Sequence, residues 1–410
     1  MKAVALLACL LATAATMPAE STVSYKGHKV FRVPVVDDGA HIQSLIDRLG
    51  LSAWQPPSKK GSFADVQVAP GQLRAFEEAL EGRSFEIMHR DLGDSIAREG
   101  SMHGYAAGSA NASWFTSYHA YSDHLQWMSD IAAQYSGNVK SVTSGTTGDG
   151  NNITGLHIFG SSGGGKKPAV VFHGTVHARE WIVAMTLEYI ANELITKYSS
   201  DSLIKDVVDK YDFYVFPVVN VDGFKYTQTS DRMWRKNRAR NQGSGCLGTD
   251  PNRNWPYKWD GPGSSKNPCA ESYRGTSAGS SPEVKSYIAF LDGIQKSQGV
   301  KVYIDWHSYS QLFMTPAPNN AALQALAKGA SDAIEAVHGT AFAHGPICNV
   351  IYQVAGGSVD WVQDVLKADN VFTIELRDTG GYGFVLPPDQ IIPSGEESFA
   401  GAMYLFQQMT

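Results

Sequence analysis

The chain has 410 residues, of which 43% are hydrophobic and 18% are charged, and its formal net charge is −6. This is the composition of a globular protein that is long enough for a large core and a second domain. So mild a charge gives no reason to expect nucleic acid or an anionic membrane as a partner, and we expect a monomer.

The first segments in chain order are a leader and a small domain. A basic start, the apolar run 3–12 and small residues up to position 19 predict a secretory signal peptide over 1–19, too short for a membrane span. Residues 20–98 are predicted to form a separate α+β antiparallel sandwich. Its strands are expected at 30–36, 64–68 and 85–88, and its helices at 41–49 and 72–80.

A linker is predicted next, over residues 99–113. The segment is small, polar and without a hydrophobic period, which is typical of a flexible connection and a protease target. Arg98 is the basic residue nearest to a processing site, and no clear dibasic pair accompanies it. Secretion would make Asn111 and Asn152 potential glycan acceptors, since each begins a sequon.

From residue 114 onward, strand-like and helix-like runs alternate. This rhythm predicts one α/β domain over 114–410, with a mostly parallel or mixed central sheet flanked by helices. The expected strands are 169–172, 213–219, 302–305 and 371–375. The expected helices are 181–197, 282–295, 321–337, 357–368 and 396–408.

Three cysteines lie outside the leader. Cys246 and Cys269 enclose a loop rich in Gly, Ser, Pro and Asn, which would gain most from a crosslink. A bridge there would stabilise the chain by about 3 kcal/mol on the loop-entropy relation. Cys348 would then remain as a free thiol.

The most informative motif is His177-Ala-Arg-Glu180, together with His307. A His-x-x-Glu pair alone is common, and a lone histidine at a strand end is usually structural. Here the pair follows the apolar run 169–172 and His307 follows the run 301–306, so both lie beyond strand ends, where ligands gather in α/β sheets. Two histidines and a carboxylate can hold one zinc ion and leave a fourth position for water.

Other residues could supply the chemistry that a zinc hydrolase needs. Glu375 ends the apolar run 371–374. A carboxylate in a buried strand needs either a catalytic role or a partner. A role as the catalytic base and a salt bridge to Arg377 are equally compatible with this position. Arg235 belongs to a cationic cluster that could bind an oxyanion or simply be a solvated loop.

Substrate-binding candidates come from two further segments. Arg253 follows Asn252, and an arginine beside an amide suits bidentate recognition of a carboxylate. Tyr352 precedes paired glycines and could swing over a site, although most tyrosines simply pack.

Together these segments resemble the secreted zinc metallocarboxypeptidases of the pancreatic A/B type. The resembling motifs follow the family order across nearly all of residues 114–410. They are His-Ala-Arg-Glu-Trp at 177–181, Met-Trp-Arg-Lys-Asn-Arg at 233–238, Asp-Pro-Asn-Arg-Asn-Trp at 250–255, Asp-Trp-His-Ser-Tyr-Ser-Gln at 305–311, Ile-Tyr-Gln at 351–353 with Gly-Gly-Ser-Val-Asp-Trp at 356–361, and Thr-Ile-Glu-Leu-Arg-Asp-Thr-Gly at 373–380.

The resemblance implies one zinc ion per chain, bound by His177, Glu180 and His307. It implies that Glu375 takes a proton from the zinc-bound water and passes it to the leaving amine. Arg235 would polarise the scissile carbonyl and stabilise the oxyanion.

The resemblance also assigns the substrate contacts. Asn252, Arg253 and Tyr352 would hold the free C-terminal carboxylate of the substrate, and Arg179 would contact the substrate further along the groove. Asp250 matches a partner of the first zinc histidine, which a zinc-bound imidazole usually requires.

Specificity, crosslinking and activation follow from the same resemblance. Val359 matches the bottom of the side-chain pocket, where an acidic residue would select Lys or Arg, so valine implies an A-type preference for aromatic and aliphatic C-terminal residues. Cys246 and Cys269 match the disulfide of the family. Residues 20–98 resemble its activation segment by size and pattern, which implies a zymogen activated by a protease that cuts the linker.

Two alternatives belong to other functional classes. A non-catalytic binding module on the same scaffold would be expected to lose the base, a ligand or the carboxylate arginine, and this chain keeps them. An endopeptidase or amidase with the same metal site would have no use for Asn252, Arg253 and Tyr352.

Overall fold

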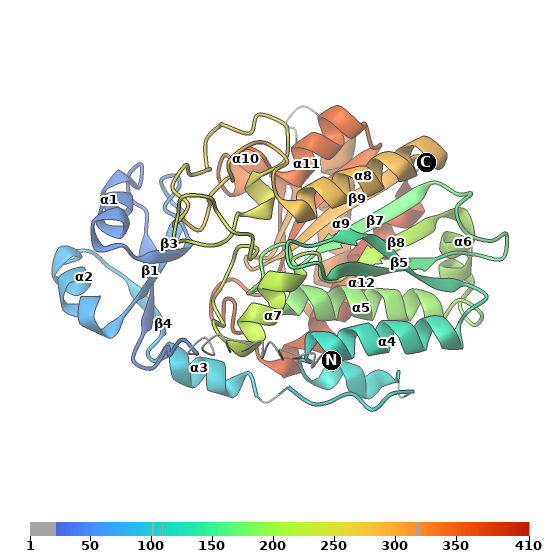
Figure 1. Ribbon diagram of the computed structural model, residues 1–410, viewed down its shortest axis with the longest axis horizontal. Helices are drawn as coiled ribbons and strands as arrows, with labels where there is room; N and C mark the ends of the chain where they lie inside the picture. The colour runs from blue at the N-terminus through green and yellow to red at the C-terminus, as the bar shows by residue number, and fades with distance from the viewer. Residues whose placement is uncertain (1–21, 101, 109, 317–319, 410) are drawn as a thin grey trace, which may run out of the picture.

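The computed structural model describes residues 22–100, 102–108, 110–316 and 320–409, and it forms two lobes (Figure 1). The predicted leader over 1–19 lies outside the described residues. The small lobe comes from the N-terminal part of the chain and lies beside one end of the larger lobe, with α1 and α2 on its outer side.

The small lobe is an antiparallel sheet with two helices packed on it, as predicted. The strand order is β2-β3-β1-β4, with bounds Ser52–Gln55, Phe63–Val68, Lys29–Pro34 and Glu86–His89. The helices are α1, Ala40–Leu49, and α2, Leu73–Ala79. Helix α1 buries Ile42, Leu45 and Ile46, which lie on one face at the spacing of a helix against a sheet. Strand β2 was not predicted because its two apolar residues, Ala53 and Trp54, are adjacent and do not alternate.

The predicted linker differs from a flexible segment at both of its ends. Helix α3, Leu92–Arg98, leads directly to Glu99, which is buried against Arg232 of the large lobe. At the other end, Asn111 caps a short 3-10 helix over Ala112–Thr116. Residues 102–104 and 106–108, between these anchors, are exposed. Composition could not predict the anchoring of Glu99, because its partner lies far along the chain.

The large lobe is built on a mixed sheet of eight strands, in the order β11-β10-β12-β9-β7-β8-β6-β5. Strands β12, β9, β7 and β8 are parallel and form its centre. Antiparallel strands extend the sheet on both sides. In chain order the bounds are β5 Val139–Thr146, β6 Asn152–Ile158, β7 Ala169–Gly174, β8 Asp212–Phe216, β9 Val300–Ser308, β10 Leu312–Thr315, β11 Ala343–Pro346 and β12 Asn370–Leu376.

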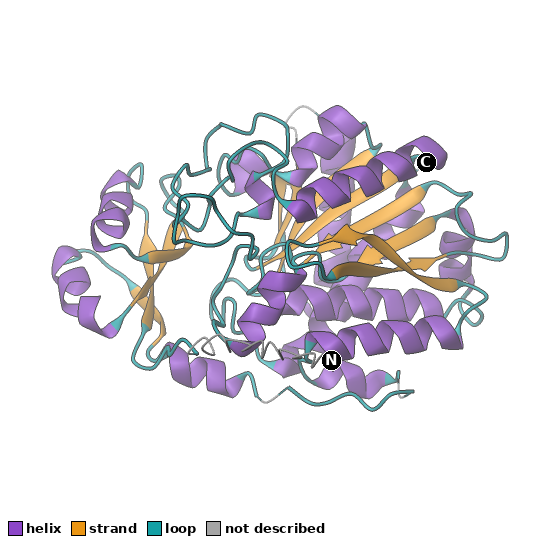
Figure 2. Ribbon diagram, in the orientation of Figure 1, coloured by secondary structure: helices purple, strands orange, loops and turns teal. Residues whose placement is uncertain are grey.

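Helices cover both faces of this sheet (Figure 2). Helix α12 packs against both α5 and α9 on one side of the sheet, and α8 lies across the other face. The helices of the lobe are α4 Tyr121–Gln134, α5 Trp181–Thr196, α6 Ser202–Lys210, α7 Val221–Thr229, α8 Pro282–Ser297, α9 Ala321–His338, α10 Ile347–Val350, α11 Ser358–Trp361 and α12 Ile391–Gln408. The prediction of an α/β domain with a mixed sheet flanked by helices is confirmed.

Two predicted helices have different bounds. Helix α12 begins at Ile391, five residues before the predicted start, because Pro393 lies in its first turn, where a missing N–H costs nothing. The helix predicted over 357–368 is a single turn, α11, followed by a π-helical turn over Val362–Leu366.

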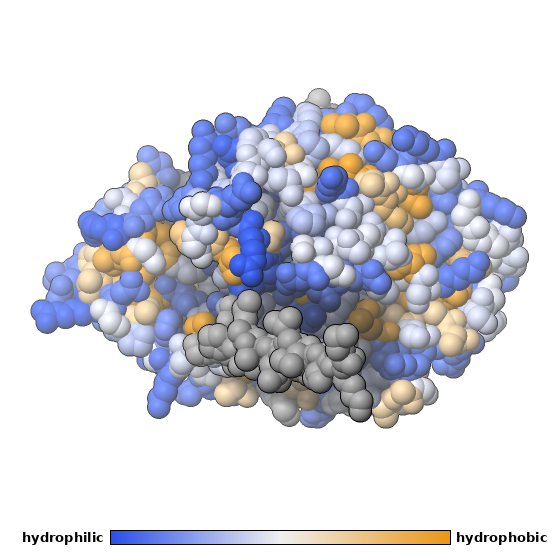
Figure 3. All heavy atoms as spheres, in the orientation of Figure 1, coloured by the Kyte–Doolittle hydropathy of each residue, from blue (hydrophilic) through white to orange (hydrophobic). Residues whose placement is uncertain are grey.

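No helix in the described part of the chain is both long and apolar enough to cross a bilayer. On the face shown in Figure 3, apolar side chains form small patches separated by hydrophilic residues. The large apolar residues that are exposed come from both lobes, and they include Phe63, Phe85 and Leu203.

Candidate metal centre and active site

The three predicted metal ligands lie where two neighbouring parallel strands end. The loop after β7 carries His177 and Glu180 to the start of α5. His307 is the penultimate residue of β9, which pairs in parallel with β7. Because the carboxyl ends of parallel strands meet at one edge of a sheet, the side chains converge there.

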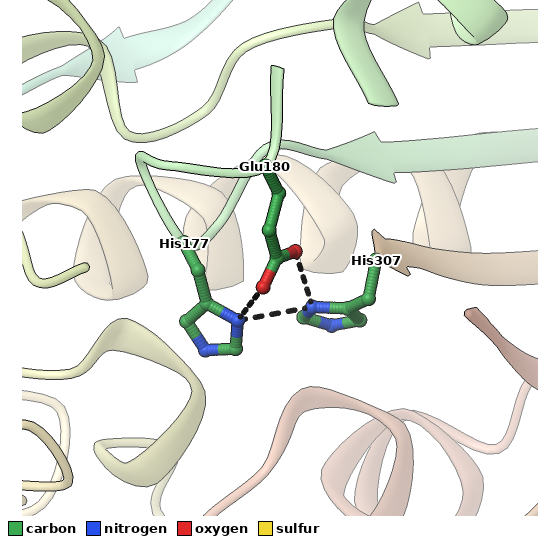
Figure 4. Close-up of side chains that lie close together, drawn as sticks. All are labelled: His177, Glu180 and His307. Carbon is green, nitrogen blue, oxygen red and sulfur yellow. Dashed lines mark hydrogen bonds and ion pairs between the residues drawn. The ribbon is translucent and has the colours of Figure 1, made fainter. Parts of the chain in front are cut away.

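The ligand atoms of these residues, which we call the metal corner, face one another (Figure 4). Nδ1 of His177 lies 2.7 Å from one carboxylate oxygen of Glu180, and Nδ1 of His307 lies 3.2 Å from the other. The two Nδ1 atoms are 3.2 Å apart. All three residues are buried, with 2–5% of their surface exposed. Two imidazole nitrogens and a carboxylate around one point form the donor set of a catalytic zinc site.

Buried carboxylates lie against the outer nitrogens of both histidines. Nε2 of His177 is 3.3 Å from Asp250, and Nε2 of His307 is 3.0 Å from Asp305. A proton on each Nε2 leaves the Nδ1 lone pair available to a metal. Burial alone would raise the pKa of both aspartates. The Arg235 guanidinium beside Asp250 and the imidazole of His307 beside Asp305 instead hold the two pKa values below their ordinary range.

Glu375 lies beside the metal corner on the adjacent strand. Strand β12 runs parallel to β9 and pairs Glu375 in register with His307. Burial raises the pKa of Glu375 to about 8. The alternative salt bridge to Arg377 is not formed, because the Arg377 guanidinium binds Glu397 instead, with Nε 2.9 Å from the carboxylate.

Arg235 is fixed beside the same corner. Its Nη2 donates to Asp250 at 2.9 Å and its Nε donates to the same oxygen at 3.2 Å. Asp250 therefore lies between a predicted zinc histidine and the predicted oxyanion arginine. A charged and preoriented guanidinium at this place can stabilise negative charge that develops near the metal.

One cavity of about 420 Å³ joins the metal corner to the other predicted site residues. Its lining includes His177, Glu180, His307, Arg235, Glu375, Asn252, Arg253, Tyr352 and Val359. Residues from six separate segments of the sequence therefore face one space.

Backbone contacts orient the predicted carboxylate-binding pair. Nε of Arg253 donates to the carbonyl of Gly263 at 2.8 Å, and Nη1 donates to the carbonyl of Asn252 at 2.9 Å. These carbonyls fix the plane of the guanidinium without cancelling its charge. Oδ1 of Asn252 accepts from the backbone N–H of Ser358 at 2.9 Å, which directs the amide nitrogen toward Asp305.

Comparison with known families matches both lobes. Residues 124–401 match the family described as zinc carboxypeptidase, and residues 36–99 match carboxypeptidase activation peptide. The chain belongs to the zinc carboxypeptidase family. It carries the activation peptide of that family and is a zinc-dependent hydrolase.

Relatives of this zinc carboxypeptidase share its full length. The metallocarboxypeptidase A-like protein of Trichophyton verrucosum (strain HKI 0517) is 49% identical over 427 residues, covering 100% of both chains. Carboxypeptidase A2 of Mus musculus is 36% identical over 403 residues, covering 94% of each. The crystal structure of thrombin activatable fibrinolysis inhibitor has a TM-score of 0.85 at 29% identity, covering 94% of this chain and 99% of that one.

The activation lobe of this carboxypeptidase lies against the mouth of the cavity. Trp54 and Gln55, both in β2, belong to the cavity lining. The Trp54 ring packs on Phe384, with centroids 5.1 Å apart, and on Tyr309 at 6.4 Å. Gln55 also donates to the hydroxyl of Ser310.

Charged pairs reinforce this contact between the lobes, which we call the seam. Asp65 of β3 is completely buried, and it accepts from Nε of Arg32 at 2.8 Å and from the hydroxyl of Tyr309 at 2.6 Å. Glu99 accepts from Nε of Arg232 at 2.7 Å and from its Nη2 at 2.6 Å. The seam therefore combines an apolar cluster with the buried ion pair of Glu99 and Arg232 and the hydrogen bond from Tyr309 to Asp65.

Arg179 is predicted to bind the substrate, but it does not line the cavity. Its guanidinium is 1% exposed and contacts Glu271 with both terminal nitrogens, at 3.1 and 3.2 Å. Ser52 of the activation lobe donates to the same carboxylate at 2.8 Å. The Arg179 guanidinium is therefore already paired within the large lobe, and the activation lobe adds a hydrogen bond from Ser52 to the same Glu271.

Cys246 and Cys269 form the disulfide that the resemblance implies, with Cα atoms 5.1 Å apart. Cys348 is free and exposed, and it lies among the residues that line the cavity.

Sequence reasoning missed Asp305, although a signal for it existed. Asp305 is an acidic residue inside an apolar strand, two positions before His307. Residues two apart in a strand lie on the same face of the sheet, so this spacing places Asp305 beside His307.

Proposed function

We propose that this chain is the secreted zymogen of an A-type exopeptidase, which removes aromatic and aliphatic residues from the C-terminal ends of peptides and proteins. The observation that carries this proposal is the single cavity shared by the metal corner, Glu375 and Arg253. A metal hydrolase with a fixed cation near its base can recognise a chain end by its terminal carboxylate.

One zinc ion per chain would be held by Nδ1 of His177, the carboxylate of Glu180 and Nδ1 of His307. Bound there, zinc supplies a polarised water molecule and a Lewis acid for the scissile carbonyl. The burial of the three residues and the carboxylates on both outer imidazole nitrogens support this assignment.

Glu375 and Arg235 carry the proton and the developing charge. Glu375 takes a proton from the attacking water and passes it to the leaving amine. Arg235 polarises the scissile carbonyl and stabilises the tetrahedral oxyanion. The ion pair of Arg235 with Asp250 keeps the guanidinium in place before a substrate arrives.

Asn252, Arg253 and Tyr352 hold the terminal carboxylate of the substrate and so place the last peptide bond over the metal corner. Arg179 contacts the substrate further along the groove once the activation lobe has left.

Apolar side chains line part of the cavity. Val359 lines the cavity together with Met314, Ile347 and Val354, and these side chains favour an aromatic or aliphatic residue. Val359 at the bottom of the pocket provides no carboxylate to pair with Lys or Arg.

A protease activates the enzyme by cutting within residues 99–113. The exposed residues 102–104 and 106–108 are accessible to it, whereas Glu99 is buried. The disulfide supports secretion into an oxidising compartment. The mature enzyme acts as a monomer.

The test uses two peptides that differ only at the C-terminus, one with a free carboxylate and one with an amide. After the 99–113 segment is cut, we expect release of a C-terminal Phe from the free acid only, and loss of that activity on treatment with a zinc chelator. Cleavage of the amidated peptide would favour the endopeptidase or amidase alternative. Zinc binding without cleavage of either peptide would favour the non-catalytic binding module.

A further inference from the structure

Asp305 is an acceptor shared by elements that meet under the active site. It lies in β9, two residues before His307, and it is completely buried. A buried carboxylate is costly unless donors satisfy it, so the identity of those donors shows what the residue holds.

Four side chains donate to Asp305. Nδ1 of His173, on the adjacent strand β7, lies 2.9 Å from Oδ1. Three donors share Oδ2. They are Nε2 of His307 at 3.0 Å, Nδ2 of Asn252 at 3.2 Å and the hydroxyl of Ser358 at 2.6 Å.

The three donors on Oδ2 serve different parts of the proposed site. His307 belongs to the metal corner. Asn252 lines the cavity, and Asp305 takes only one of its two amide hydrogens, which leaves the other for a substrate carboxylate. Ser358 begins α11, and the next residue, Val359, lines the pocket for the last side chain.

Asp250 gives a useful contrast. It lies against His177 and Arg235, and it also accepts from the backbone N–H of Asn252 at 2.9 Å. Asp250 thus joins one ligand to the residue that would stabilise the oxyanion. Asp305 joins the other ligand to the groups that would bind the end of the substrate.

We propose that Asp305 is a positioning residue that sets His307, Asn252 and α11 together, so that metal affinity and recognition of the C-terminal residue depend on one carboxylate. This inference rests on the proposed function. Asp305 touches neither the metal nor the substrate, and it acts only through the three side chains on Oδ2.

The first test measures zinc affinity in the full-length zymogen by chelator competition, which does not depend on activity. Asp305→Asn keeps the volume of the side chain but replaces one acceptor with a donor. We expect zinc affinity to fall by about 10- to 100-fold. The matched control is Glu188→Gln, because Glu188 is also a completely buried carboxylate bonded to a histidine, His124, at 2.8 Å, and it lies outside the site.

The second test measures KM and kcat for a free-acid peptide, with zinc saturating and the 99–113 segment cut. Asp305→Asn should raise KM several-fold more than it lowers kcat. In an Asn252→Ala background the part of this KM increase that acts through Asn252 should vanish. The double variant would then show much less than the sum of the two single effects.

Ser358→Ala tests the hydrogen bond from Ser358 to Asp305, and it keeps the proposal testable if Asp305→Asn fails to fold. It removes only the hydrogen bond to α11. We expect a higher KM for a peptide ending in Phe and a zinc affinity unchanged within about twofold, since His307 keeps its partner.

The inference is overturned if Asp305→Asn matches Glu188→Gln in both zinc affinity and KM, or if Ser358→Ala leaves KM unchanged. It is also overturned if the effects of Asp305→Asn and Asn252→Ala on KM simply add. These outcomes are distinct from failure of the proposed function, in which the unaltered enzyme itself would not cleave the free-acid peptide.

Discussion

The metal corner and the seam are both buried and polar, but they are built differently. In the metal corner, the outer nitrogen of each histidine lies against a carboxylate of the same lobe, Asp250 or Asp305. In the seam, the polar contacts join two lobes, as in the ion pair of Glu99 with Arg232 and the hydrogen bond from Tyr309 to Asp65. The corner is therefore complete within the large lobe, whereas the seam exists only while the activation lobe is present.

The catalytic groups therefore lie in a different part of the molecule from the contacts that hold the activation lobe over them. Removing the activation lobe takes away Trp54 and Gln55 from the cavity mouth but leaves every ligand of the metal corner and every partner of those ligands in place. A cut after Glu99 leaves the Glu99 to Arg232 pair intact, so cutting and release are two separate steps.

The largest expected effect lies beside the metal corner. Glu375→Gln keeps the shape of the side chain but removes the proposed base, and we expect kcat to fall by about 10² to 10⁴-fold. Zinc content should stay at that of the unaltered enzyme, because Glu375 is not a ligand. Rates from stopped assays and metal analysis of the same sample measure both, and a variant that retains full kcat would refute the role.

Arg235→Gln should lower kcat by about 10² to 10³-fold with a smaller change in KM, because a stabiliser of the oxyanion acts mainly in the transition state. Since Arg235 also binds Asp250, metal content must be measured alongside the kinetics. A change confined to KM would place Arg235 in substrate binding instead.

The seam is tested by Asp65→Asn, which replaces the charged acceptor of the hydrogen bond from Tyr309 across the lobes with a neutral one. A hydrogen bond to a charged acceptor contributes about 1.5–3 kcal/mol, roughly twice as much as a neutral one, so the cut activation lobe should dissociate about 3- to 10-fold more readily. The measurement is the rate at which activity appears after cutting. Glu77→Gln is the control, because the Lys29 to Glu77 pair lies within the same lobe and is exposed. Equal rates for the two variants would contradict a role for Asp65 in the seam.

Val359→Asp should shift preference toward C-terminal Lys and Arg without loss of zinc. A carboxylate at the bottom of the pocket pairs with a basic side chain and destabilises an aromatic one. The ratio of kcat/KM for peptides ending in Arg and in Phe measures the shift. An unchanged ratio would place Val359 outside the specificity pocket.

The smallest expected effect concerns Asp212, a buried carboxylate at the start of β8. It lies at the amino ends of the parallel strands, away from the metal corner at their carboxyl ends. Burial opposes ionisation, but hydrogen bonds from His157 and from the backbone N–H groups of Lys166 and Lys167 keep the pKa of Asp212 below its ordinary value. Stability from this group is therefore present above its unfolded pKa and is lost as pH falls through the folded one.

Asp212→Asn should therefore lower the free energy of unfolding by about 1–3 kcal/mol at pH 7, and by less in acid. Urea unfolding at the two pH values measures this difference, and kcat should not change. A loss of kcat would remove the contrast between a buried carboxylate that only stabilises the fold and those of the metal corner.

Much of the fold could be predicted because buried central strands and long buried helices appear in the sequence as apolar runs, as in 169–172 and 181–197. The strands β5, β6, β10 and β11, outside the parallel centre of the sheet, were missed. Strand β5 has only two valines as apolar residues and β11 has no large apolar residue, so neither shows an apolar run. Motif spacing predicted residues that do line one cavity, such as Glu375 and Tyr352. It could not predict contacts between distant segments, and these include the binding of Glu271 by Arg179.

The most direct test of this account is anomalous diffraction at the zinc edge from crystals of the full chain. The account predicts one peak, roughly 2.0–2.2 Å from Nδ1 of His177, the Glu180 carboxylate and Nδ1 of His307. A peak bound through either Nε2, or no peak at this place in crystals that contain zinc, would contradict it.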